Sequence, residues 1–214
     1  MLLKSISSLM FLFGLPVSAL FATEVKFAGT AQACFGFQCT PSAIESIVGL
    51  SYYGSTFEGT TSDGFLAFGG SSASNSQNAE NFGLIETSVS NKSYSALPFT
   101  LRLDFDLPSG IAGNPLAYSA KLTGNLRAGA GGVSLIFDNS GPYSYTFGQG
   151  GHFDLIINNL AIAPGQTASI NGFIVNASSE VPEPKTASLL IFGAATLIAS
   201  RTFSVRFRSK VGLR

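Results

Sequence analysis

The feature that most constrains the fold of this chain is a strict alternation of apolar and polar residues from Phe99 to Asp106. Four large apolar side chains recur at every second position, and three of the four residues that follow them are charged. Successive side chains of a β-strand point to opposite faces of the sheet, so a period of two predicts a strand with one buried and one wetted face. The sequence Leu107-Pro108-Ser109-Gly110 follows and ends this strand with turn-forming residues.

Further runs with the same period follow and are separated by turns rich in Gly, Pro and Asn. They are Leu116–Leu122, Val133–Phe137, Tyr143–Phe147, Phe153–Ile157 and Ala168–Val175. We therefore predict an all-β fold for residues 23–180: an antiparallel β-sandwich of jelly-roll-like type, in which two packed sheets bury the apolar faces.

One segment carries signals for a helix. Pro41 stands near a potential helix start, and Ser42 and Glu45 form part of a capping-box pattern, which predicts a helix up to Val48. The same residues are equally compatible with a turn that leads into a strand at 49–53, and the sequence leaves both alternatives open.

The two cysteines, Cys34 and Cys39, are separated by four residues in the sequence CFGFQC. Cysteines this close in an exported protein are expected to form a disulfide that closes a small loop. A metal site would need two further Cys or His ligands, so we favour the disulfide.

Charge is distributed unevenly along the chain. Residues 23–180 contain eleven acidic and five basic side chains, a net charge of −6, whereas six basic and no acidic side chains follow from Lys185 onward. An acidic body argues against binding to nucleic acid, which requires Lys and Arg on the folded surface. Charged residues form only 11% of the chain, so Ser, Thr, Asn and Gly must wet its surface.

The first 22 residues have the layout of a secretory signal peptide, which would be helical in the membrane. Lys4 supplies the positive charge, residues 6–15 form the apolar core, and Pro16 ends it. Small residues permit cleavage after Ala19 or after Ala22. The alternative is an uncleaved N-terminal anchor.

The C-terminal 34 residues contain a proline-rich joint, an uncharged run and a basic tail in that order. The joint is Val181-Pro182-Glu183-Pro184, the uncharged run spans residues 186–200, and the basic stop comprises Arg201, Arg206, Arg208 and Lys210. As a helix the uncharged run would span roughly 22 Å, which is short for a bilayer hydrocarbon core of about 30 Å. Basic residues after the run favour a cytoplasmic C-terminus.

This arrangement resembles the PEP-CTERM sorting signal of bacterial surface and secreted proteins. The resemblance covers residues 181–214 and implies a short transmembrane helix and processing at the Pro-Glu-Pro motif by an exosortase, a membrane-embedded cysteine protease-transpeptidase. It further implies export across the inner membrane by the export machinery, transient anchoring in the membrane, and a final place at the cell surface or outside the cell. The alternative is a plain C-terminal anchor with an accidental pair of prolines.

Few residues in the body suggest catalysis or metal binding. The single histidine, His152, follows a Gly-rich turn and lacks a recognisable nucleophile motif around any serine, so we read it as a hairpin residue. Asp104 and Asp106 share one strand face and are weak candidates for calcium binding, but a wetted strand face explains them equally well.

These observations predict a non-enzymatic, exported β-sandwich protein of the cell surface or extracellular matrix, without a cofactor. Proteins with the PEP-CTERM signal are associated with biofilm-forming bacteria that make exopolysaccharide, which makes such a polysaccharide a candidate partner. The alternative function is that of an extracellular module that binds carbohydrate or calcium.

Overall fold

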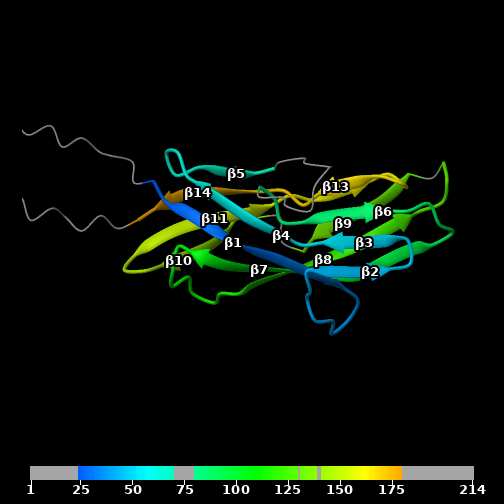
Figure 1. Ribbon diagram of the computed structural model, residues 1–214, viewed down its shortest axis with the longest axis horizontal. Coiled ribbons are helices and arrows are strands. Elements are labelled where there is room, and N and C mark those ends of the chain that lie inside the picture. The colour runs from blue at the N-terminus through cyan, green and yellow to red at the C-terminus, as the bar shows by residue number, and fades with distance from the viewer. Residues whose placement is uncertain (1–23, 70–79, 130, 139–140, 180–214) are drawn as a thin grey trace, which may run out of the picture.

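The computed structural model describes residues 24–69, 80–129, 131–138 and 141–179. These residues form fourteen β-strands and contain no helix (Figure 1). In chain order the strands are β1 (Lys26–Phe35), β2 (Ile44–Ile47), β3 (Leu50–Tyr53), β4 (Ser55–Thr60), β5 (Leu66–Phe68), β6 (Leu84–Thr87), β7 (Ser93–Leu107), β8 (Leu116–Asn125), β9 (Gly132–Phe137), β10 (Tyr143–Phe147), β11 (Gly151–Ile157), β12 (Leu160–Ile162), β13 (Thr167–Ser169) and β14 (Gly172–Ser178).

The strands form three antiparallel sheets. The largest has six strands in the order β12-β9-β8-β7-β1-β4, and two smaller sheets have the orders β10-β11-β14-β5 and β13-β6-β3-β2. The two smaller sheets occupy the two halves of the length of the molecule (Figure 1). Both pack against the large sheet: Phe27 of β1 meets Phe153 of β11 at 5.0 Å between ring centroids, and Phe99 of β7 meets Tyr52 of β3 at 6.1 Å.

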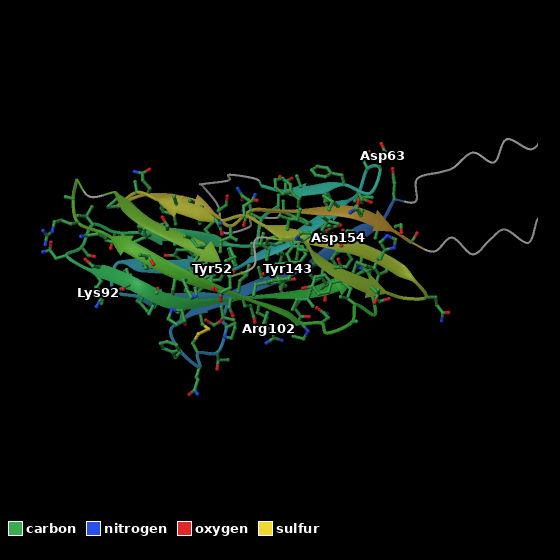
Figure 2. All side chains as sticks on the ribbon, turned by 180° about the vertical axis from the view of Figure 1, so that it is seen from behind. Tyr52, Asp63, Lys92, Arg102, Tyr143 and Asp154 are labelled. Carbon is green, nitrogen blue, oxygen red and sulfur yellow. A yellow bond between two sulfur atoms is a disulfide. The ribbon has the colours of Figure 1, made fainter. Side chains whose placement is uncertain are left out.

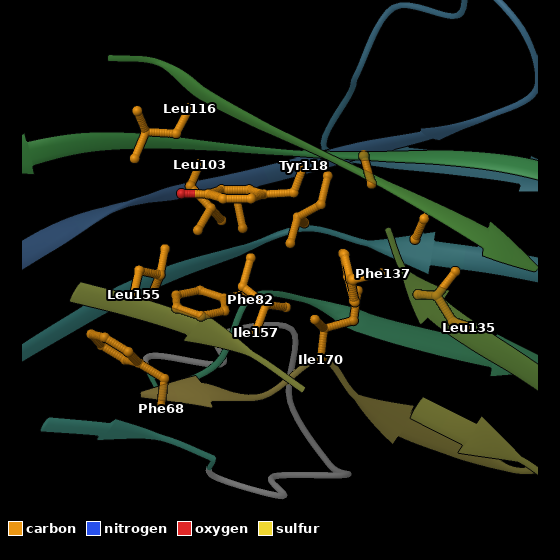
Figure 3. Close-up of a cluster of buried hydrophobic side chains, with 14 of the residues drawn as sticks. Phe68, Phe82, Leu103, Leu116, Tyr118, Leu135, Phe137, Leu155, Ile157 and Ile170 are labelled. Carbon is orange, nitrogen blue, oxygen red and sulfur yellow. The ribbon is translucent and has the colours of Figure 1, made fainter. Parts of the chain in front are cut away.

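The core lies between these layers and is rich in aromatic rings (Figure 3). Leu103, Leu116 and Tyr118 approach it from the large sheet, while Leu155 and Ile157 approach from β11 (Figure 3). Phe57 of β4 has ring contacts with Phe68, Phe82 and Phe105 at 5.1–5.3 Å. The prediction of an all-β, antiparallel fold is confirmed, and the layers pack in a sandwich-like manner.

The alternation from Phe99 to Asp106 behaves as predicted. The four apolar side chains are buried, and the intervening residues are half-buried or exposed. The predicted strands at 116–122, 133–137, 143–147 and 153–157 are all present, some with longer bounds. The run Ala168–Val175, expected as one strand, is instead divided between β13 and β14, which belong to different sheets.

Of the two alternatives for residues 41–48, the helix is wrong, whereas the strand expected at 49–53 is present as β3. Residues 44–47 form β2, which pairs with β3 in the register Ile44 to Tyr53 and Ile47 to Leu50. The Ser42 hydroxyl donates to the Ile44 carbonyl at 2.7 Å, and the Glu45 carboxylate lies farther from the same hydroxyl, at 3.4 Å. Pairing with β3 provides hydrogen-bond partners for the backbone N–H and carbonyl groups that a helix would have paired internally. Packing in the sheet therefore overrides the local capping signal.

Both ends of the body are attached to one turn. Val25 exchanges two hydrogen bonds of 2.9 Å with Thr61, and the Ala177 N–H donates to the Gly64 carbonyl at 3.0 Å. Between these contacts Asp63 and Gly64 both adopt positive φ, as a tight type I′ hairpin turn requires. Residues 24 and 179 therefore leave the body at the same end (Figure 1).

The predicted signal segment (residues 1–22) and the whole sorting segment (residues 181–214) lie outside the described residues. None of the described residues belongs to a helix with the length and apolar character needed to cross a membrane.

Candidate functional site

An apolar groove lies at the opposite end of the body from the chain ends. Its volume is about 390 Å³. It is lined by Phe35, Phe37, Ile47, Val48 and residues 92–98. Figure 2 shows Lys92, a lining residue, near one end of the molecule and Asp63, beside the attachment of both chain ends, near the other. The volume falls within the range of ordinary ligand pockets.

The groove exists because β1 stops pairing with β7 before β7 ends. Their ladder runs to the pair Phe35–Phe99, and one further bond of 2.8 Å joins the Gly36 N–H to the Pro98 carbonyl. After Gly36 the chain turns away into the disulfide loop. β7 runs antiparallel to β1 and extends past this point to its first residue, Ser93. In residues 93–97 of β7, Ser93, Tyr94 and Leu97 pair with β8 around a bulge at Ser95 and Ala96, and no described strand lies on the other side.

The disulfide expected between Cys34 and Cys39 is present, with a Cα–Cα distance of 5.8 Å. It closes the loop that carries Phe37, whose side chain is 86% exposed at the mouth of the groove. A single exposed apolar side chain is ordinary on a protein surface, so Phe37 is of interest because it lies beside other apolar residues of the groove. Val48, on the opposite wall, is 66% exposed.

Tyr94 holds the two walls of the groove together. Its hydroxyl donates to the carbonyl of Val48, which follows β2, and burial raises the pKa of this phenol. The ammonium of Lys92 lies 5.9 Å from the centroid of the Tyr94 ring. Lys92 is the one charged side chain among the lining residues, so the mouth of the groove is locally positive.

A second cluster of polar side chains lies on the outer face of the sheet formed by β10, β11 and β14. The Asp154 carboxylate accepts hydrogen bonds from the Ser144 hydroxyl at 2.6 Å and from the Asn176 amide at 2.8 Å. These two bonds, the Ser144 bond first, lower the pKa of Asp154 because they favour its charged form. On the same face Phe65, which is 49% exposed, stacks on Phe173 at 6.0 Å.

His152 lies in this second cluster, beside a serine and two positions from an aspartate. The Ser178 hydroxyl is 3.0 Å from its Nδ1 and 3.5 Å from its Nε2. A catalytic triad needs the serine on one ring nitrogen and a carboxylate on the other, whereas the Asp154 carboxylate is bonded by Ser144 and Asn176. The sequence did not reveal this proximity, because Ser178 comes from a strand 26 residues away.

The weak metal candidates Asp104 and Asp106 follow the predicted alternation, but the structure gives them different surroundings. Asp104 accepts a bond from the Asn114 amide at 3.2 Å and contacts the Arg102 guanidinium at 3.5 Å, while Asp106 is exposed. Within the described ranges no group of three or more His, Cys, Asp and Glu side chains is placed to hold a metal ion.

The remaining predicted site residues are Val181, Pro182, Glu183 and Pro184 of the sorting motif and Arg201, Arg206, Arg208 and Lys210 of the basic stop. All of them lie outside the described residues. The groove itself was missed by the sequence reading. The clue available there was the sequence Phe-Gly-Phe between the two cysteines, because a small disulfide loop cannot bury both rings.

No known protein family, no curated protein and no solved structure matches this chain. An assignment of function therefore rests on the geometry of the body and on the pattern of the sequence.

Proposed function

We propose that this chain is a non-enzymatic protein that is exported through the inner membrane, processed at a C-terminal PEP-CTERM signal, and retained at the cell surface or in the extracellular matrix. Its processing partners in this proposal are the export machinery and an exosortase-type enzyme, and exopolysaccharide is its candidate matrix partner. We also propose that the six-stranded sheet and the two smaller sheets packed against it form a jelly-roll-like sandwich.

The observation that carries the proposal is the common attachment of both chain ends at the Asp63–Gly64 turn. Residues 1–22 and 181–214 both join the body at this end, so cleavage at both signals leaves every described strand ladder in place. A body tethered through its C-terminal end would hold the far end, near Lys92 of the groove, away from the membrane, and the disulfide loop would project from its side (Figure 2).

Two further observations support the proposal. Both cysteines are joined in a disulfide, as is common in oxidising compartments outside the cytoplasm. The surroundings of His152 favour a non-enzymatic role, because its serine and aspartate neighbours are not arranged as a relay.

The test uses the full chain in a host that contains the processing enzyme. Replacing Pro182, Glu183 and Pro184 together by alanine should leave a heavier, membrane-retained form, while the wild-type chain yields a shorter product by intact mass. A matched triple substitution of Ser71, Ser72 and Ser74 to alanine should leave processing unchanged. An unchanged mass for the motif variant would contradict the sorting proposal, as would full-length protein with both ends intact in the cytosol.

The alternative of a carbohydrate-binding module is favoured by one observation, the stacked pair Phe65 and Phe173 beside the Asp154 cluster. An exposed aromatic ring next to hydrogen-bonding side chains can pack against a sugar ring and bond its hydroxyls. Glycan-array binding that is lost in Phe65→Ser would support it, and an array without signal would contradict it.

A further inference from the structure

We propose that the groove binds an extended peptide, which adds a strand to the six-stranded sheet beside residues 93–97 of β7. This inference names a partner class, and it does not depend on how the protein is delivered to its place.

The first argument concerns the edge of β7 beyond the point where β1 ends. β1 pairs with β4 over residues 26–31 and with β7 over residues 28–35, and its ladder with β7 ends at Phe35. Residues 93–97 of β7 continue beyond that point without a described strand on this edge, and a bulge at Ser95 and Ala96, where Ala96 adopts a φ of 54°, interrupts their ladder with β8 on the other edge. A strand entering there would prolong an existing ladder, in the manner of peptides that join the open edge of a sheet.

The second argument is the opposite wall. β2 is the last strand of its own sheet, and its final residue, Ile47, lines the groove together with Val48. The Tyr94 side chain crosses the space between β7 and this wall, and its hydroxyl donates to the Val48 carbonyl. The groove is therefore bordered by two strand segments, β7 and the end of β2.

The third argument is the chemistry of the lining. Phe35, Phe37, Ile47 and Leu97 offer apolar contacts, and Ser93 and Ser95 add hydroxyl groups on the β7 side of the groove. A bound strand points every second side chain toward one face, so apolar residues at alternate positions would meet these contacts. Main-chain hydrogen bonds would supply affinity, and the apolar contacts would supply selectivity.

The fourth argument is charge. Lys92 places a cation at the mouth of the groove, on a body whose described residues carry ten acidic and five basic side chains. A peptide with a carboxylate near that end would be complementary to Lys92. The net negative charge of the body disfavours an anionic membrane surface as the occupant of the same groove.

The experiment uses the exported protein with its disulfide intact. The probe is a peptide library of about seven residues, a strand length of roughly 23 Å, with Val, Ile, Leu or Phe at alternate positions, Ser or Thr between them, and a free terminal carboxylate. A matched library has N-methylated peptide bonds, which cannot donate to a neighbouring strand. Binding is measured by fluorescence anisotropy, and the site is located by amide hydrogen exchange.

Selected peptides should bind the protein and slow exchange of the amides in residues 93–97, and their N-methylated counterparts should not bind. Phe37→Ser should weaken binding about tenfold, because it removes an exposed apolar wall. Phe65→Ser, an equivalent change at an exposed ring outside the groove, should have no effect. Lys92→Gln should weaken carboxylate peptides about two- to fivefold and leave amidated peptides unchanged.

Three results would overturn the inference: the absence of any binding peptide, equal binding of the N-methylated library, or protection at a different strand edge. Binding of anionic vesicles that is lost in Phe37→Ser, without peptide binding, would assign the groove to a membrane instead. Because Phe37 and Lys92 are exposed side chains, neither substitution is expected to disturb folding.

Discussion

The side chain of Asn114 bonds both backbone groups of Phe105, as a paired strand would. The Phe105 N–H donates to its Oδ1 at 3.0 Å, and its Nδ2 donates to the Phe105 carbonyl at 2.9 Å. The same Nδ2 lies 3.2 Å from the Asp104 carboxylate. One amide thus satisfies the β7 backbone where the ladder with β8, which begins at Leu116, has ended.

Asn114→Ala should therefore destabilise the protein by about 1–3 kcal/mol, because it leaves a partly buried N–H and carbonyl without a partner. The free energy of unfolding from urea denaturation is the measurement. Asn91→Ala, at an exposed asparagine, is the matched control and should stay within about 0.5 kcal/mol of wild type. Equal stabilities for the two variants would show that water replaces the Asn114 bonds.

Two buried tyrosines should make the fold sensitive to alkali. Burial raises the pKa of Tyr52 and of Tyr118, and the Tyr52 hydroxyl donates to the Phe82 carbonyl at 3.1 Å. A phenol whose pKa is raised in the folded state contributes fully to stability below its unfolded pKa of about 10. This contribution falls as the pH rises above that unfolded value. Each buried phenol should then reduce the free energy of unfolding by about 1.4 kcal/mol per pH unit.

The measurement is urea denaturation between pH 8 and 12, at constant ionic strength. Tyr52→Phe should lower stability at neutral pH by about 1 kcal/mol and flatten the alkaline slope. Tyr53→Phe, at the exposed neighbour of Tyr52, should leave the slope as in wild type. A slope that Tyr52→Phe does not change would contradict this assignment.

The Cys34–Cys39 bridge should contribute modestly to global stability and strongly to the local order of the groove. Closing so short a loop contributes about 2 kcal/mol in the chain-entropy description. The double substitution of both cysteines to serine should lower the free energy of unfolding by about that amount. Hydrogen exchange should accelerate mainly in residues 35–42, and a uniform acceleration over β10 and β11 would contradict a local role.

Asp154 should titrate below the usual range of an aspartate, since hydrogen bonds from Ser144 and Asn176 favour its charged form. A lowered pKa stabilises the fold above the unfolded value near 3.9, and this contribution is lost as the pH falls toward the folded value. At a partly exposed site the effect should be below about 1 kcal/mol. NMR titration should show the pKa rising in Ser144→Ala, and Ser119→Ala, on an exposed strand face elsewhere, should not change it.

The strand β1 shows why the sequence revealed some elements and not others. Its inward positions are Phe27, Gly29, Ala31, Ala33 and Phe35, so the period of two is present but its centre consists of small residues. The small size is required there: a Cβ on Gly29 would lie 2.3 Å from the Asp104 carbonyl oxygen. A pattern that depends on large apolar side chains therefore overlooks this strand, which pairs with both β7 and β4.

The sequence by itself determined which faces are buried in β7 to β11, that a turn falls at Pro108-Ser109-Gly110, and that the two cysteines pair. These are local properties, set by side-chain alternation, backbone preference and short loop length. Only the tertiary structure decided that β1 lies between β7 and β4, that residues 44–47 form a strand, that Ser178 reaches His152, and that β1 leaves β7 at Phe35 to open a groove. Alternation shows which way a side chain points but does not identify the neighbouring strand, and these neighbours come from distant parts of the chain.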